Sequence, residues 1–410
     1  MLIILHQRGC RKVARKIASD LGDAFTGFVK VGLIAASSSS SWPAEASWDD
    51  LLIVVYNGKE FPAAGNSFIT QYLKERSPSA TVLPVAIEAA ARKPPDAAAE
   101  FKALEYDAAA EGPTGRLANR VGGMLGLRVQ SRDSKIFISY RATDGAAIAT
   151  QLHNHLVGLG HHVFLDEAKE IDGETRIIPG SRVQTQIDDA LGQSNCVLLI
   201  DTPSAPDSRW IMREVETAES LLLPILPICF RDKGDPKQGP RFKSLLALQR
   251  WVQLQRPDAT EDPPLSASQL DHIVSEAEEY LCDIFKRKCR VPFIVEKEFA
   301  SRGFAWHVLD QRLLMFASTK GNNWRVRTKV LSHCSVFDPN YSPAIRRFGE
   351  FLRGAARSNY SLFLYDGDLL PELQLREIVE SDEDESVIIL HHQELAALID
   401  SNFTNLVAMA

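Results

Sequence analysis

Several familiar patterns are absent from the 410-residue sequence, beginning with long apolar runs. The longest run, Leu221–Phe230, spans about ten residues and contains Pro224 and Pro227, so it is too short and too irregular to cross a bilayer. The apolar start of the chain ends at Leu5 and is followed by His6, which leaves it too short for the core of a signal peptide. We therefore expect a cytoplasmic protein that does not enter the membrane.

Metal and nucleotide motifs are absent as well. The six cysteines are scattered without a CxxC pair, and Cys196 and Cys229 fall in apolar runs, which predicts reduced, buried thiols rather than a zinc site. There is no GxGxxG and no Walker A loop, so a classical dinucleotide fold or an NTPase is not indicated. One group of histidines resembles a metal cluster, but no carboxylate or cysteine completes a ligand set, and we predict no metal: His153, His155, His161 and His162.

Composition and charge are ordinary for a globular protein. Hydrophobic residues make up 45% and charged residues 24% of the chain, and its length predicts two or three domains, each with its own core. The net charge of −7 and the pI near 5.9 argue against general binding of polyanions, although they leave room for a local basic patch.

The clearest strand–helix–strand pattern lies in the middle of the chain. Lys135–Arg141 begins with the apolar residues of a buried parallel strand and ends in the polar sequence Ser-Tyr-Arg. A stripe at helical spacing follows, which Thr143 or Asp144 can cap and Gly160 can end: Ile148, Leu152, His155, Leu156 and Leu159. His162–Asp166 is then a second strand. The carboxyl ends of such parallel strands form the edge where ligands bind.

The alternation of strands and helices continues beyond this unit. A polar loop, Glu167–Pro179, precedes a helix after Ser181. The remaining pattern predicts strands at Cys196–Ile200, Leu226–Phe230, Phe242–Leu246 and Trp251–Leu254, and helices at Trp210–Leu222 and Leu265–Lys286.

Six fragments of this region stand in a characteristic order: Phe137-Ile-Ser-Tyr-Arg, Phe164-Leu-Asp, Pro179-Gly180 with the helix after it, Asp189-Ala-Leu-Gly-Gln-Ser-Asn-Cys-Val-Leu-Leu-Ile, Ser208-Arg-Trp-Ile-Met-Arg-Glu and Leu226-Pro-Ile. Each fragment is weak alone. Together they make the region from Ser134 to Lys288 resemble a TIR (Toll/interleukin-1 receptor) domain, as in bacterial TIR proteins and in the NAD-cleaving TIR domain of the animal axon-degeneration enzyme.

This resemblance implies a flavodoxin-like parallel sheet with helices on both faces. It also implies an activity, because catalytic members of the family hydrolyse or cyclise NAD+ with a glutamate in the helix after the fourth strand, and that position is Glu214. Nicotinamide leaves as a neutral molecule, so one carboxylate that stabilises an oxocarbenium-like transition state can dominate the chemistry. Glu216 faces elsewhere on the helix and Glu219 is the less favoured alternative. NAD+ is the expected substrate, and no cofactor is expected.

The other residues expected to bind the substrate lie at the same edge: Ser139, Tyr140, Arg141, Phe164, Asp166 and Trp210. Simpler roles stay open for several of them. Arg141 can contact the phosphates or the ribose, or be an exposed loop arginine. Tyr140 and Trp210 can be core residues, and Asp166 can position the loop that follows it.

Residues 1–130 are expected to form an α/β domain of TIR-like or Rossmann-like type. The pattern predicts strands at Leu2–Leu5, Gly27–Ile34, Leu51–Tyr56 and Thr81–Ile87, and helices at Cys10–Leu21, Ser67–Arg76 and Arg116–Leu127. The strand–helix–strand segments that begin at Leu51 and at Cys196 have similar spacing, which suggests a worn repeat.

The aligned repeat has no second glutamate. Pairing Phe68 with Trp210 puts Tyr72 where the middle domain has Glu214. We therefore expect residues 1–130 to be a packing or assembly module, and residues 131–288 to be the TIR domain.

Residues 289–410 are expected to form a third α/β domain of regulatory or sensor type. The predicted strands are Val291–Val295, Trp306–Leu309, Leu313–Phe316, Val326–Leu331, Leu362–Tyr365 and Val387–Leu390, and the predicted helices are Pro343–Arg357 and Gln393–Ser401. A basic face is compatible with a nucleic-acid or nucleotide trigger, or with a helix that is simply exposed: Arg325, Arg327, Lys329, Arg346, Arg347, Arg353 and Arg357. Glu380–Glu385 is expected to be a solvated loop.

The sequence thus predicts a TIR-domain NAD+ glycohydrolase, with ADP-ribose or a cyclic isomer as product. By the resemblance it is a regulated bacterial anti-phage effector that self-associates through its TIR domains and is triggered through residues 289–410 by a nucleotide, a nucleic acid or a partner protein. The alternatives are a non-catalytic TIR adaptor that binds other TIR domains and another nucleoside-processing activity at the same edge.

Overall fold

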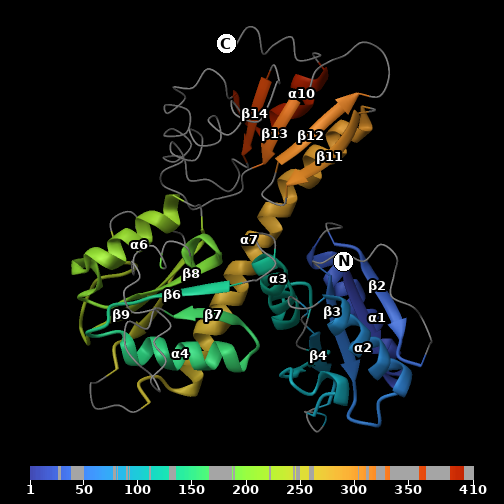
Figure 1. The fold of residues 1–410 in the computed structure, drawn as a ribbon, viewed down its shortest axis with the longest axis horizontal. Helices are drawn as coiled ribbons and strands as arrows, with labels where there is room; N and C mark the ends of the chain where they lie inside the picture. The colour runs from blue at the N-terminus through green and yellow to red at the C-terminus, as the bar shows by residue number, and fades with distance from the viewer. Residues whose placement is uncertain are drawn as a thin grey trace.

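The computed structural model comprises three sheets joined by one long helix (Figure 1). The residues it describes are 1–25, 29–37, 50–76, 80, 82–88, 91, 93–109, 112–128, 135–165, 187, 190–220, 223–242, 245, 250–257, 263–302, 304–310, 314–319, 328–332, 360–365 and 388–400.

The first sheet is entirely parallel and has the order β2-β1-β3-β4-β5. Its strands are β1 (Leu2–His6), β2 (Val31–Ala35), β3 (Leu51–Tyr56), β4 (Val82–Ala86) and β5 (Leu104–Glu105). Helices α1 (Arg11–Ala24) and α3 (Arg116–Arg128) cover one face, and α2 (Ala63–Arg76) covers the other. The central strands are buried on both faces, which explains why β1 and β3 are continuous apolar runs rather than alternating ones.

The second sheet repeats this order. Its strands are β6 (Lys135–Ser139), β7 (His162–Leu165), β8 (Ser194–Asp201), β9 (Ile225–Arg231) and β10 (Val252–Gln255), and the order β10-β9-β8-β6-β7 is the order of the first sheet read from the other side. All its pairs are parallel. Helices α4 (Ala146–Gly158) and α7 (Ala267–Ser301) cover one face, and α6 (Arg209–Ser220) covers the other. The expected flavodoxin-like sheet is confirmed, and the shared order supports the expected repeat.

Two details of the second sheet differ from the sequence expectations. Phe242 and Leu245 are buried beside α6 but do not form a strand, because an apolar segment can fill the core from a loop as well as from a sheet. Neither Thr143 nor Asp144 caps α4, whose first turn follows Gly145 without a side-chain cap.

Helix α7 connects all three parts of the molecule. It packs on the second sheet through Ile273 and on the core of the first through Phe285, whose ring meets Phe25 edge-on at 5.6 Å between centroids. Gly122 of α3 lies so close to Cys282 of α7 that a Cβ there would stand 2.2 Å from its Sγ. The two helices therefore require a residue without a side chain at this crossing.

The helix also corrects the sequence prediction for its second half. The predicted helix ended at Lys286 and a strand was expected at Val291–Val295, but α7 continues to Ser301 and contacts β11, β13 and α10. Strand propensity of a few β-branched residues is a weak local preference, and packing on the third sheet outweighs it. The domain boundary expected after residue 288 falls inside this helix.

The third sheet is mixed. Its order is β11-β12-β13-β14-β15, with strands at Phe304–Asp310, Leu314–Thr319, Thr328–Ser332, Tyr360–Tyr365 and Ile388–His391. The first three strands are antiparallel and the last three parallel. Helix α10 (Leu395–Asp400) is tied to the end of α7 by an ion pair between Arg302 and Asp400 at 2.5 Å. The expected helix Pro343–Arg357, the acidic loop 380–385 and most of the expected basic face lie outside the described residues.

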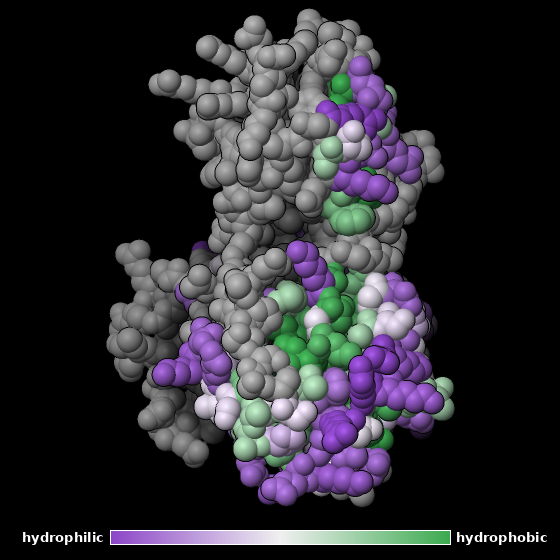
Figure 2. Space-filling view, turned by 90° about the vertical axis from the view of Figure 1, so that its right-hand side faces the viewer, coloured by the Kyte–Doolittle hydropathy of each residue, from purple (hydrophilic) through white to green (hydrophobic). Residues whose placement is uncertain are grey.

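The surface of the first domain carries an apolar area framed by hydrophilic residues (Figure 2). On this side of the molecule β2 forms the edge of the first sheet, and Leu33 of that strand is 38% exposed. Within the described part of the chain, no helix has the length and apolar character needed to cross a membrane.

Candidate functional site

The carboxyl end of β6 and the helix α6 bring together the central pair of the site. Glu214 lies on α6 and Ser139 is the last residue of β6, and the hydroxyl of Ser139 donates a hydrogen bond of 2.6 Å to Oε2 of Glu214. Both residues are buried, with 6% and 1% of their surface exposed. Burying a carboxylate costs free energy unless polar groups compensate it, and the Ser139 hydroxyl is one such group for Glu214.

The alternation of β6 explains why Ser139 reaches Glu214. Ile136 and Ile138 face α4 and α7, whereas Phe137 packs on the α6 side, so Ser139 follows it on that face. On α6, Ile211 and Val215 anchor the helix to the sheet, and Glu214 lies between them in sequence on the inward side. Glu216 is exposed, as the sequence predicts.

Two aromatic residues of the predicted site take different positions. Trp210, in the first turn of α6, is 58% exposed, so its indole is not a core residue. Phe164 of β7 is half-buried and stacks on Phe137, with 5.3 Å between ring centroids and 17° between planes. It therefore lies on the same face of the sheet as Ser139. Tyr140 is half-buried and packs against the core on the opposite side, which favours the packing role left open for it.

Arg141 holds a loop in place. Its Nη1 donates to the carbonyl oxygen of Ser204 and lies 3.9 Å from Oδ2 of Asp207, both in the loop between β8 and α6. The hydroxyl of Ser204 donates to Oδ2 of Asp144. Arg141 therefore binds the backbone of Ser204, and Asp144 binds its side chain. Ser204 and Asp207 were not expected from the sequence, because nothing in their local pattern shows which distant residue they meet.

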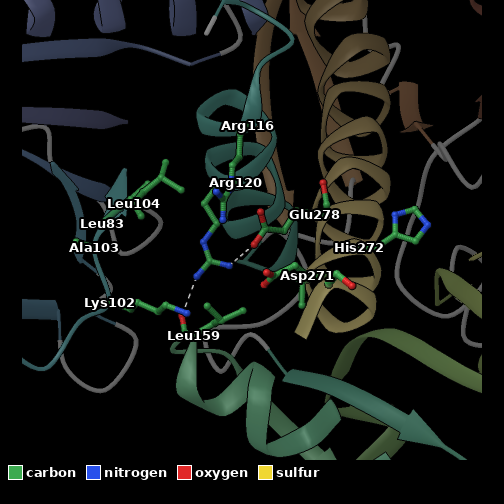
Figure 3. Close-up of a pocket in the computed structure, with 13 residues that line it drawn as sticks. Leu83, Lys102, Ala103, Leu104, Arg116, Arg120, Leu159, Asp271, His272 and Glu278 are labelled. Carbon is green, nitrogen blue, oxygen red and sulfur yellow. Dashed lines mark hydrogen bonds and ion pairs between the residues drawn. The ribbon is translucent and has the colours of Figure 1, made fainter. Parts of the chain in front are cut away.

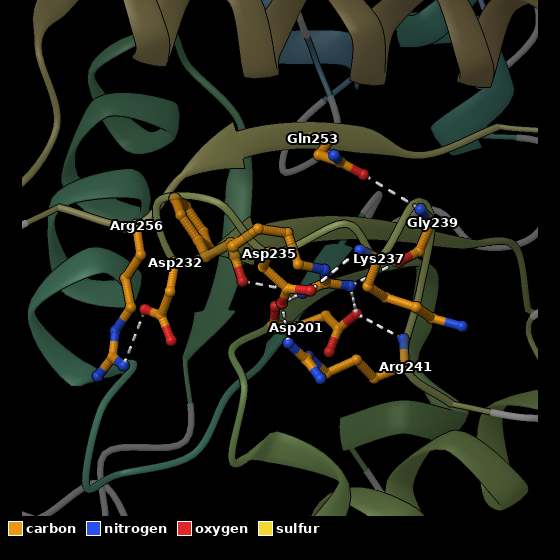
Figure 4. A network of polar contacts seen from close by, with 10 residues as sticks. Asp201, Asp232, Asp235, Lys237, Gly239, Arg241, Gln253 and Arg256 are labelled. Atoms are coloured by element: carbon orange, nitrogen blue, oxygen red, sulfur yellow. Dashed lines mark hydrogen bonds and ion pairs between the residues drawn. The ribbon is translucent and has the colours of Figure 1, made fainter.

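A buried ion pair braces the other side of this edge (Figure 4). Asp201 ends β8, and its Oδ2 accepts hydrogen bonds from Nη2 of Arg231 at 2.7 Å and from the backbone N–H of Arg241 at 2.8 Å. Nη1 of Arg231 also donates to the carbonyl oxygen of Asp201 at 2.9 Å. Nη2 donates to the carbonyl oxygen of Gly239, whose φ of 71° suits glycine. The end of β8, the end of β9 and the loop after it are thereby fixed to one another.

Asp166 and the loop 167–179 lie outside the described residues. Of the seven predicted site residues, the structure therefore brings Glu214, Ser139 and Phe164 to one face, leaves Trp210 exposed at the start of the same helix, and assigns Arg141 to the loop.

The first sheet has a different arrangement at the corresponding edge. Gln7, directly after β1, donates from Nε2 to the carbonyl oxygens of Glu60 at 2.8 Å and Lys59 at 3.3 Å, and its Oε1 accepts from the backbone N–H of Asn57 at 3.2 Å. Tyr72 does not match Glu214 in position. Its hydroxyl donates to the carbonyl oxygen of residue 50, just before β3, at the amino end of the sheet.

The described cysteines Cys10, Cys196, Cys229 and Cys282 are free and buried, as expected. Burial, with a smaller contribution from Glu88, raises the pKa of Cys10 to about 11, and burial raises the pKa of Cys282 to about 11. These thiols are therefore protonated and unreactive at neutral pH. Among the described residues, no group of His, Cys, Asp and Glu side chains is arranged to hold a metal ion.

Comparison with known proteins assigns the second sheet to a family. Residues 136–266 match the TIR domain family. Among solved structures, one that the chain is similar to shows the TIR domains of the activated Roq1 resistosome directly recognizing the pathogen effector XopQ. The identity is 16%, the match covers 37% of this chain and 82% of that chain, and the TM-score is 0.22. No curated protein matches the chain.

Proposed function

Residues 136–266 form a TIR domain, and from this premise we propose that the protein is an NAD+ glycohydrolase that cleaves the bond between nicotinamide and ribose. The observation that carries the proposal is the buried carboxylate of Glu214, held by the Ser139 hydroxyl at the carboxyl edge of the sheet. This edge is where parallel α/β sheets bind ligands.

The reaction suits a single carboxylate. The bond between C1′ of the ribose and the pyridinium nitrogen breaks with its electron pair going to nitrogen, so nicotinamide departs neutral and needs no proton. Positive charge develops on C1′ and the ring oxygen, and a fixed carboxylate nearby stabilises it. Water then adds to C1′ and loses a proton to give ADP-ribose, whereas attack by the adenine of the same molecule gives a cyclic isomer.

The neighbours of Glu214 fit supporting roles in this reaction. Ser139 orients the carboxylate through the hydrogen bond that its hydroxyl donates. The exposed indole of Trp210 offers an apolar surface for nicotinamide or adenine. Arg141 acts through the loop that it holds, and its role is to position that loop before α6. No cofactor is needed, because NAD+ itself is the substrate.

The proposal extends to regulation. An unrestrained NAD+ hydrolase would deplete the cell that makes it, so the two flanking domains are proposed to hold the activity in check until a trigger induces self-association through the TIR domains. This is the behaviour of a bacterial anti-phage immune effector acting in the cytoplasm. The trigger is proposed to reach the protein through residues 289–410.

The test is NAD+ consumption by the purified full chain at high concentration with a crowding agent. Glu214→Gln keeps the size and hydrogen-bonding capacity of the side chain but removes its charge, so we expect turnover to fall by about 10²-fold or more. Glu216→Gln, on the exposed side of the same helix, is the matched control and should keep wild-type turnover. Equal activity in the wild type and Glu214→Gln would place the chemistry elsewhere.

A non-catalytic TIR adaptor is the second candidate, and the exposure of Trp210 favours it. A tryptophan that is 58% exposed is typical of a protein interface. An adaptor would show no NAD+ turnover at any concentration but would self-associate in analytical ultracentrifugation, and Trp210→Ala would abolish that association.

A further inference from the structure

A pocket of about 460 Å³ lies where the first domain, helix α7 and the TIR domain meet (Figure 3). The first domain contributes residues from β4, from the loop before β5 and from α3, the TIR domain contributes Leu159 after α4, and α7 contributes its first turns. Its volume is within the range of pockets that hold small metabolites.

The inner wall of the pocket is built from a closed set of buried polar groups. Nη1 of Arg120 contacts Oε1 of Glu278 and donates to Nε2 of His161 at 2.6 Å, and its Nη2 donates to the carbonyl oxygen of Leu159 at 2.8 Å. Burial would raise the pKa of Glu278, but the charge of Arg120 outweighs it and lowers that pKa. Burial also lowers the pKa of His161, and Arg120 adds to this, so the imidazole is neutral and accepts from the guanidinium.

Arg120 lines the pocket, and its two Nη atoms already bond to Glu278, His161 and Leu159, so we treat this residue as part of the wall. It joins α3 of the first domain, α7 and the turn after α4 of the TIR domain. The wall of the pocket is therefore formed by contacts of Arg120 that exist without a bound ligand.

Two further cations face the same space and are not neutralised. Arg116 lies one turn before Arg120 on α3, and Lys102 lies in the loop before β5. Both are exposed, and among the described residues neither forms an ion pair. In a chain with a net charge of −7, two unpaired cations in one concavity form a local positive site.

The opposite wall offers hydrogen-bonding groups. Ser268, His272 and Ser275 line it from successive turns of α7. The carboxylate in this wall, Asp271, lies 3.6 Å from Nε2 of His155 of the TIR domain. The pocket thus has a cationic side for an oxyanion and, on α7, a side with hydroxyl, imidazole and carboxylate groups for the hydroxyl or ring nitrogen atoms of a ligand.

We propose that this pocket binds a small phosphorylated metabolite of about nucleotide size. Lys102 and Arg116 hold the phosphate, since ammonium and guanidinium groups form strong charge-assisted hydrogen bonds with phosphate oxygens. The α7 wall holds the remainder. The bound molecule bridges the first domain and α7 next to the contact with the TIR domain, so it stabilises one arrangement of the three parts.

Isothermal titration calorimetry of the full chain with AMP, inorganic pyrophosphate and adenosine tests this. We expect saturable binding of AMP and pyrophosphate and none of adenosine, which lacks the phosphate. The double variant Lys102→Gln/Arg116→Gln should weaken binding about tenfold or more, because both charged partners are lost. Lys12→Gln/Arg15→Gln, which removes two exposed cations from α1 outside the pocket, is the matched control and should bind like wild type.

Ser275→Phe provides a second variant, because it fills the pocket from an exposed position on α7 without touching the cations. It should also weaken AMP binding. Absence of saturable binding by AMP and pyrophosphate to the wild type would overturn the proposal. Unchanged affinity in both pocket variants would do the same, since the phosphate would then bind elsewhere.

Discussion

The first sheet and the TIR sheet share one strand order, yet the polar side chains at their carboxyl edges differ. At the TIR edge, Ser139 and Glu214 present a buried carboxylate between the sheet and α6. At the edge of the first sheet, Gln7 uses its whole amide to hold the chain after β3. The comparison teaches that the fold supplies the edge, and that the side chains placed there decide whether it can do chemistry.

The two edges also differ in how they are braced. The TIR edge depends on a charged pair, Asp201 and Arg231, both almost fully buried. The carboxyl edge of the first sheet uses a neutral group, the amide of Gln7. Charged bracing is strong only while both partners are present, so the two sheets should respond differently to single substitutions.

The largest expected effect is from Asp201→Ala. It leaves the Arg231 guanidinium buried without its charged partner, and we expect a loss of about 3–5 kcal/mol in the free energy of unfolding, measured by urea denaturation. The control is Asp96→Ala in the first domain, which breaks the exposed pair with Lys93 and should leave the stability essentially unchanged. If both variants were equally stable, the charged brace would contribute nothing.

A smaller effect is expected from Gln7→Leu, which keeps the approximate size of the side chain but removes its three hydrogen bonds. The backbone groups of Asn57, Lys59 and Glu60 lose their partners, and we expect a loss of about 1–3 kcal/mol in the free energy of unfolding. Gln71→Leu on the surface of α2 removes an exposed side-chain pair and should change stability by less than about 0.5 kcal/mol. A cost for Gln7→Leu no greater than that of Gln71→Leu would show that the amide does not brace the edge.

The smallest effect on stability, and the sharpest contrast between the sheets, is expected from Ser139→Ala and Tyr72→Phe. Each removes one buried hydroxyl and one hydrogen bond, so each should cost about 1 kcal/mol in thermal or urea unfolding. Of the two variants, Ser139→Ala should lower NAD+ turnover, by about tenfold, because the Ser139 hydroxyl contacts the Glu214 carboxylate whereas the Tyr72 hydroxyl bonds within the first sheet. A similar fall in Tyr72→Phe would mean that the first sheet takes part in the reaction.

The sequence predicted the elements around the site well because their signals are local. The apolar runs of β3, β6 and β8 and the amphipathic pattern of α6 each lie within one short segment, and all were placed correctly. Glu214 was found by its place in the TIR pattern, and the structure adds that it is buried against Ser139. The partner of Arg141 could not be predicted, since Ser204 is 63 residues away and joins it only when β6 and β8 pair.

The wrong predictions also come from local patterns, in segments where contacts with distant residues decide the structure. Val291–Val295 has the β-branched residues of a strand, but α7 continues through it because the helix packs on the third sheet. Phe242 has the hydrophobicity of a strand residue, but it fills the core from a loop. Tyr72 was matched to Glu214 by spacing along a helix, whereas its hydroxyl bonds at the opposite end of the sheet.

The sequence by itself determined the two parallel sheets and the family of the second, and it singled out Glu214 as the candidate catalytic residue, because short-range hydrophobic periodicity and motif order are written in consecutive residues. Only the tertiary structure decided what the polar side chains do. Arg141 bonds to the loop before α6, and Gln7 bonds to the chain after β3 at the carboxyl edge of the first sheet. Arg120 lies between Glu278 and His161, in the wall of the pocket at the junction. These contacts join residues far apart in the chain, and their geometry exists only after the sheets have formed and the helices have packed on them.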